Sequence, residues 1–301
     1  MLTWSLLSVF SAVFLGFYDV AKKSAVRGNA VPPVLLLNVL TAALLWLIPL
    51  CISLSSPSWI PFPAMIVESI SWKTHLLLAL KSLLVGASWI LALYALKHLP
   101  MSIAAPIRAT SPFFTILISV TLMDERPSAG QWTGIIIILT AFYAFSVVGR
   151  AEGIHFHRNR WVGLMIAATI LGAASALYDK HLLQNLALKP ATVQAWFSVY
   201  LVPVMIPLAA HWFRNERQNA PFEWRWSIPM IAVLLLLSDF LYFTAIGQPD
   251  ALISVISPLR RTSLVIAFVA GIRMYGETNW RPKLLCVLGI LAGVYVLSLS
   301  R

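Results

Sequence analysis

The chain has 301 residues, of which 59% are hydrophobic and only 11% are charged. A soluble domain is about half apolar and about a quarter charged, so this composition excludes a single water-soluble globule and indicates an integral membrane protein. The net charge of +11 would suggest a nucleic-acid partner in a soluble protein. Here the basic residues lie mostly in short connections between apolar runs, where they set orientation in the bilayer, so we expect no nucleic-acid partner.

The apolar runs predict an all-α fold. A helix needs about 20 apolar residues to cross the hydrocarbon core, and continuous runs of this length are not the alternating strands of a membrane barrel. The first run lacks the basic start and cleavage site of a signal peptide, so we interpret it as an uncleaved helix. The sequence predicts ten transmembrane helices, over residues 2–21, 33–54, 75–97, 101–122, 131–149, 161–183, 191–211, 227–246, 252–272 and 283–300. The longest connection, 55–74, is rich in Pro and Trp and is predicted to be an interfacial loop.

The chain also repeats itself. Residues 106–146 align with residues 258–298, so that Arg108 falls on Arg260, and Asp19 falls on Asp179 in the first helix of each half. We therefore expect two five-helix repeats, 1–150 and 151–301. An odd number of helices per repeat inserts the two halves in opposite senses, an inverted-repeat plan typical of secondary transporters, whose sites lie at the repeat interface near the midplane.

The segment YALKHLPMSIAAPIRATSPFFTILISVTLMDERPSAGQWTG resembles the fourth-helix region of the EamA-type drug/metabolite transporter family. That pattern has an Ala-Leu pair, a small-residue helix with a Pro, and Leu-x-Glu-Arg, which here reads Met123-Asp124-Glu125-Arg126. The second copy keeps Glu277 and has Thr278 in place of Arg. The resemblance implies an inner-membrane carrier or exporter of small metabolites, with a central cavity lined mainly by the third, fourth, eighth and ninth helices.

Orientation stays open at this point. Basic residues are concentrated in the connections after odd-numbered helices, which favours both termini outside the cytoplasm. The family resemblance implies both termini inside.

Three arginines are candidates for substrate recognition. A charge near the centre of a membrane costs at least ~2.5–3.5 kcal/mol, so it persists when it is paired or lines a wet cavity. Arg108 and Arg260 each follow a helix-kinking Pro by two residues, and Arg261 doubles the charge in the second half. A guanidinium is well shaped to bind a carboxylate, phosphate or sulfonate. The alternative is a structural ion pair, or snorkelling toward an interface.

Three carboxylates are candidates for proton coupling, because burial favours the protonated form of an acid. Asp19 and Asp179 also have a structural reading, since Lys22 or Lys23 and Lys180 follow them closely. Asp239 lies in the middle of its predicted helix, and the candidate partner of opposite charge is Lys81 in the third predicted helix. Either these two pair across the bundle, or Asp239 couples protons and Lys81 binds substrate.

Aromatic residues on the presumed cavity helices, Trp89, Tyr94 and Tyr242, are predicted to wall the site, although such residues are often packing. The intramembrane charges lean positive, with Lys81, Arg108, Arg260 and Arg261 against Asp19, Asp179 and Asp239, which favours an anionic or zwitterionic substrate. Glu125 and Glu277 are expected to cap their helices. We see no ATP-binding loop, no metal-ligand spacing and no cofactor motif, so none is expected.

These patterns predict a secondary transporter of a small polar metabolite that works by alternating access, in a bacterial inner membrane. The alternatives are a lipid or lipid-linked-sugar flippase and, from another class, a membrane enzyme or sensor. The partners expected are a small-molecule substrate and the bilayer, and a homodimer is left open.

Overall fold

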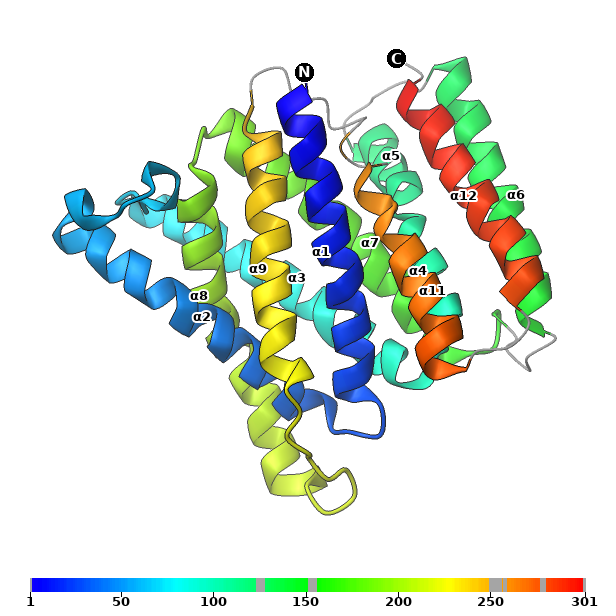
Figure 1. Cartoon of the computed structure of the whole chain (residues 1–301), viewed down its shortest axis with the longest axis horizontal. Coiled ribbons are helices and arrows are strands. Elements are labelled where there is room, and N and C mark those ends of the chain that lie inside the picture. The colour runs from blue at the N-terminus through cyan, green and yellow to red at the C-terminus, as the bar shows by residue number, and fades with distance from the viewer. Residues whose placement is uncertain are drawn as a thin grey trace.

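The computed structural model describes residues 2–122, 128–150, 156–248, 256, 259–276 and 280–299. Throughout this part of the chain every regular element is helical. Figure 1 shows the helices packed side by side in one bundle, with the two marked termini at the same end. Within these described ranges, six helices are long and apolar enough to cross a membrane, over Trp4–Val26, Val31–Ser55, Trp72–His98, Arg160–Asn185, Pro190–Glu216 and Ser227–Ile246. The protein is thus an all-α integral membrane protein.

Most of the helices overlap the apolar runs of the sequence, and the helix described within the run at 252–272 begins only at Ser263. Their bounds are α1 (Leu2–Val26), α2 (Val31–Ser55), α3 (Trp72–His98), α6 (Ala129–Arg150), α7 (Arg160–Lys180), α8 (Pro190–His211), α9 (Ser227–Ile246), α11 (Ser263–Tyr275) and α12 (Trp280–Leu299). Local signals explain several starts, because the side chains of Ser71 and Asn159 cap α3 and α7 by accepting from the free backbone N–H groups of Thr74 and Trp161. The connection after α2 holds two short 3₁₀ turns, Pro57–Trp59 and Pro63–Met65.

The fourth apolar run is not one helix. It divides into α4 (Met101–Ala109) and α5 (Ser111–Leu122), with a turn at Thr110 whose hydroxyl donates to the Ile107 carbonyl at 2.6 Å. Pro112 has no N–H to offer the Arg108 carbonyl one turn earlier, which is a sufficient reason for the helix to stop here. The break places Arg108 and Ser111 on either side of one turn, and both of them line the cavity described below.

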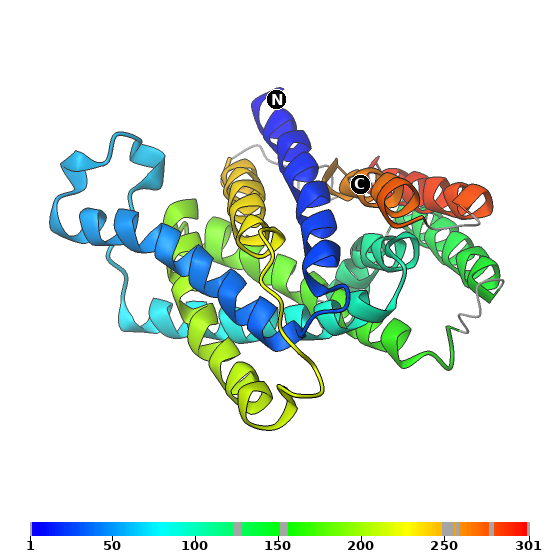
Figure 2. The ribbon, with the colours of Figure 1, turned by 60° about the horizontal axis from the view of Figure 1, so that its bottom comes forward.

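The principal helix contacts join the first half of the chain to the second. α1 packs on α9, α2 on α8, α3 on α7, α6 on α12, and α4 on α11. Figures 1 and 2 show α1 beside α9 and α6 beside α12. At the first of these contacts Ser11 and Ser238, both fully buried, donate to each other's backbone carbonyls at 2.8 and 2.9 Å. The cavity therefore lies between helices drawn from both halves of the chain.

A glycine on α12 sets how closely that helix approaches α6. A Cβ at Gly293 would lie 2.7 Å from the Ile138 side chain and 2.9 Å from the Ile138 backbone N, which cannot move aside alone. We expect Gly293→Ala to lower the free energy of unfolding by ~1–3 kcal/mol, the usual effect of overpacking. Thermal unfolding of the detergent-purified protein measures it. Gly163 is the control, because a Cβ there meets nothing within 4 Å; equal shifts for Gly163→Ala and Gly293→Ala would contradict the packing argument.

Candidate functional site

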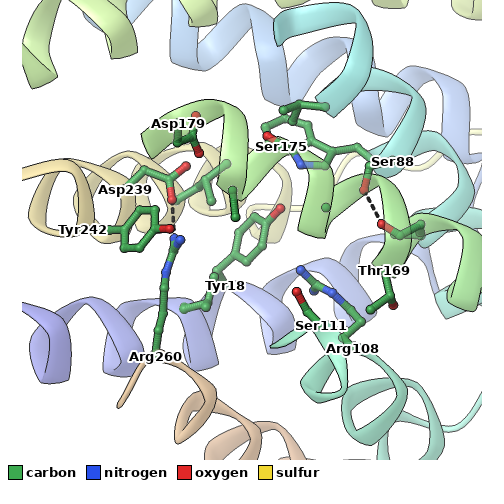
Figure 3. A pocket seen from close by; sticks show the side chains of 18 of the residues that line it. Tyr18, Ser88, Arg108, Ser111, Thr169, Ser175, Asp179, Asp239, Tyr242 and Arg260 are labelled. Atoms are coloured by element: carbon green, nitrogen blue, oxygen red, sulfur yellow. Dashed lines mark hydrogen bonds and ion pairs between the residues drawn. The ribbon is translucent and has the colours of Figure 1, made fainter. Parts of the chain in front are cut away.

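A cavity of about 150 Å³ lies inside the bundle. It is bounded by α1, α3, α7, α8 and α9, by the break between α4 and α5, and by the two arginines in front of α11. Figure 3 shows polar side chains from these elements turned toward one space. The polar residues of the lining are Tyr18, Lys22, Lys81, Ser88, Trp89, Arg108, Ser111, Thr169, Ser175, Asp179, Asp239, Tyr242, Arg260 and Arg261.

One carboxylate, that of Asp19, serves two cations. Lys22 lies 2.9 Å from Asp19 Oδ1 and Arg108 Nη1 lies 2.5 Å from the same oxygen. Lys22 is almost fully buried and also lies over the Tyr18 ring, at 4.2 Å from its centroid. The sequence predicted Lys22 or Lys23 as the partner of Asp19. In the structure Asp19 pairs with Lys22 and also with Arg108 from the fourth apolar run.

A second ion pair joins Arg260 to Asp239. The Arg260 guanidinium also lies 3.8 Å from the centroid of the Tyr242 ring, a cation–π contact. Figure 3 shows Arg260 and Asp239 pointing toward each other with Tyr242 beside them. The pair comes from residues near in sequence, on α9 and just before α11.

A third pair joins Lys81 on α3 to Asp179 on α7. Lys81 is 2% exposed and Asp179 is 6% exposed, so this is the most deeply buried pair of the site. The pairing of Lys81 with Asp239 that the sequence left open is wrong, because α3 packs directly on α7 while Asp239 is taken by Arg260. The local partner expected for Asp179, Lys180, is likewise replaced by Lys81.

Among the described residues, Arg261 is the cation of the cavity lining for which no ion pair with a carboxylate is seen. Its guanidinium reaches Ser111 Oγ at 3.4 Å, and its Nε is buried without a hydrogen-bond partner. Among the described residues, the cavity lining holds five cations, Lys22, Lys81, Arg108, Arg260 and Arg261, against two carboxylates, Asp179 and Asp239, and Asp19 behind the lining adds a third. The site therefore carries surplus positive charge in a buried setting, which suits an anionic group.

Most residues singled out from the sequence meet at this cavity. Trp89 and Tyr242 are in its lining, whereas Tyr94 is not and instead packs against the apolar cluster around Leu93. Asp19 lies behind the lining, in a second void of about 10 Å³ that shares Lys22 and Arg108 with the first. Glu125 and Glu277 lie outside the described residues.

Sequence reasoning singled out Asp179 but missed other polar residues that the first and sixth apolar runs bring to the site. Tyr18 and Lys22 on α1, and Thr169 and Ser175 on α7, line the cavity beside the helices that the family resemblance emphasised. The signal was present in the small residues of α7, since Gly172 and Ala176 leave room beside Ser175. Across the described residues no group of three or more His, Cys, Asp or Glu could hold a metal ion.

Comparison with known proteins gives three findings. Residues 2–147 match the EamA-like transporter family. Two curated relatives from Pseudomonas aeruginosa, strains UCBPP-PA14 and PAO1, both called pseudopaline exporter CntI, are 26% identical over 212 residues, 69% of this chain and 69% of theirs. A solved crystal structure shares the fold over 98% of this chain and 96% of its own, with a TM-score of 0.63 and 15% identity.

Proposed function

Because this chain belongs to the EamA-type drug/metabolite transporters, with the family's domain over residues 2–147, we propose that it exports a small polar metabolite, anionic or zwitterionic, by alternating access. The similarity to two bacterial exporters supports outward transport and a place in a bacterial cytoplasmic membrane. Membership of a transporter family also favours transport over the enzyme or sensor alternative.

The observation that carries the substrate class is the unpaired charge of Arg261. Arg260 is paired with Asp239, and Arg108 shares Asp19 with Lys22, so both arginines already have a carboxylate of the protein. Arg261 lines the same cavity with a planar fork of donors, and within the described parts of the chain the Ser111 hydroxyl is the hydrogen-bond acceptor that it reaches. A substrate carboxylate, phosphate or sulfonate would bind the Arg261 guanidinium through charge-assisted hydrogen bonds.

Two voids on either side of one ion-pair cluster support passage through the bundle. Asp19, Lys22 and Arg108 separate the main cavity from the smaller void, whose far side is apolar and includes Leu96 and Met165. Rearrangement of this cluster would join the two spaces. Alternating access requires such a barrier on each side of the site, and this cluster is our candidate for one of them.

The experiment is a thermal-stability screen of the detergent-purified protein against amino acids, organic acids, phosphorylated metabolites and lipids. A ligand at a hundred times its dissociation constant stabilises the folded state by ~2.7 kcal/mol, which moves a melting curve measurably. Stabilisation by small anions or zwitterions, followed by transport of the same compounds in proteoliposomes, is the expected result. Stabilisation by lipid headgroups alone would replace the proposal with a flippase.

A further inference from the structure

The three carboxylates of the site differ in the kind of cation that holds them. Asp19 and Asp239 are paired with guanidinium groups, which do not lose their proton in proteins and therefore keep a neighbouring carboxylate ionised. Asp179 is paired, among the described residues, with the ammonium of Lys81 alone. Its counterpart in the first half of the chain, Asp19, is held by two cations. Of the three carboxylates, Asp179 is thus the one whose ionised form is stabilised least by its partner cations.

Lys81 has other partners that remain when Asp179 becomes neutral. Its ammonium lies 4.7 Å from the centroid of the Phe197 ring and 5.2 Å from that of Phe243. Aromatic faces attract a cation, most strongly where water is excluded. Lys81 can therefore keep its proton and its place while Asp179 alone changes charge, and both residues line the cavity through which a proton would arrive.

The other charged and titratable groups around Asp179 do not take over this role. From α9 come Asp239 and Tyr242, and Arg260 precedes α11; these three are held together by the ion pair and the cation–π contact. On α7 itself Lys180 is exposed, and the Tyr178 hydroxyl donates to the Leu77 carbonyl at 3.2 Å. From α8 the cavity lining receives Phe197, which contacts Lys81 and is neither charged nor titratable.

We propose that Asp179 is the proton-binding carboxylate of the transporter, and that its protonation releases Lys81 from the ion pair so that Lys81 can bind the substrate. A proton from the cavity binds a carboxylate oxygen of Asp179, the Lys81 Nζ–H···O contact is lost, and Lys81 stays charged. The cavity then holds one more uncompensated cation beside Arg261. Proton and substrate anion therefore bind with the same sign of linkage, so that each strengthens binding of the other. This inference rests on the proposed transport of an anionic group.

Infrared spectroscopy tests the proton site without any substrate. When the purified wild-type protein is acidified, the carbonyl-stretch absorption band of a buried protonated carboxylic acid should appear. Asp239→Asn should keep that band, and Asp179→Asn should lose it. Because Asp179→Asn leaves Lys81 without its carboxylate, the charge-neutral pair Lys81→Gln/Asp179→Asn is measured as well. A band retained in the Asp179 variants, or lost in Asp239→Asn, overturns the assignment.

Binding tests the linkage. The probe is L-glutamate, whose net charge is the same at neutral and mildly acidic pH, or inorganic sulfate if L-glutamate does not bind. Wild type should bind the probe about tenfold more tightly at mildly acidic pH, a coupling of ordinary size, and Lys81→Gln/Asp179→Asn should bind it equally at both. Equal or weaker binding by wild type in acid overturns the linkage. If no metabolite binds at all, the proposed transport fails, and the infrared result still decides on Asp179.

Discussion

Arg261→Ala is expected to weaken binding of the anionic substrate by about 100-fold, a loss of ~2–3 kcal/mol. Truncating one member of a buried, hydrogen-bonded charge pair typically costs ~2–5 kcal/mol, because the partner charge is left in a poorly solvated place. In the proposed complex this charge pair is formed by Arg261 and the substrate anion, since no carboxylate among the described residues binds Arg261. Ligand titrations followed by melting temperature, or by calorimetry, give the dissociation constants.

Two further variants separate charge from general effects on the protein. Arg261→Lys keeps the charge and removes the planar fork, so an intermediate loss is expected if the substrate group is bound by two parallel hydrogen bonds. Arg214→Ala removes an exposed arginine in the helical turn Trp212–Glu216 that follows α8, and should leave the dissociation constant unchanged. Unchanged affinity in Arg261→Ala would remove this residue from the recognition site.

Asp19→Asn is expected to destabilise the fold by ~3–5 kcal/mol, the effect of breaking a buried pair by removing one partner. The effect should be large because one carboxylate serves both Lys22 and Arg108, so its loss leaves two buried cations close together. Thermal or denaturant unfolding in detergent measures the change. Asp19 also holds Lys22 and Arg108, which line both voids and belong to the proposed barrier, so the variant should exchange substrate poorly even where it stays folded.

The matched control is Glu68→Gln, which breaks the pair that Glu68 makes with Lys189 at 2.7 Å on the surface. Both of those side chains are exposed, and pairs of this kind contribute about 0–1 kcal/mol. A similar change in both variants would mean that the Asp19 cluster is solvated and does not act as a buried barrier.

The helical architecture followed from the sequence because apolar length is a direct physical requirement of crossing a bilayer. The run at 227–246 coincides with α9. The run at 101–122 is divided into two helices, and the run at 252–272 meets a helix described only from Ser263 to Tyr275. The turn at Thr110 could also have been foreseen, since Pro112 removes the N–H that would continue the helix through Arg108. The two five-helix repeats stay a prediction, although Arg108 and Arg260 do meet at one cavity.

The partners of the charged residues were less accessible to sequence reasoning. Lys81 could have paired with Asp239 or Asp179, because nothing in the apolar runs says which helix packs on α3. Only the contact between α3 and α7 decides for Asp179. The exclusion of Tyr94 from the cavity has the same origin, since the face of a helix that turns inward depends on its neighbours and α3 has no strong amphipathic pattern.

The contacts between early and late helices have a consequence for biosynthesis. Lys81 and Asp179 are 98 residues apart, and at ordinary translation rates of about 5–20 residues per second the ribosome needs about 5–20 s to supply the second after the first. During that interval α3 carries an unneutralised ammonium in the membrane, and α1 and α2 lack the helices on which they finally pack. Nascent chains stalled before α7 should therefore be short-lived in the cell, and quality-control proteases that remove unassembled membrane helices would meet this protein halfway through its synthesis.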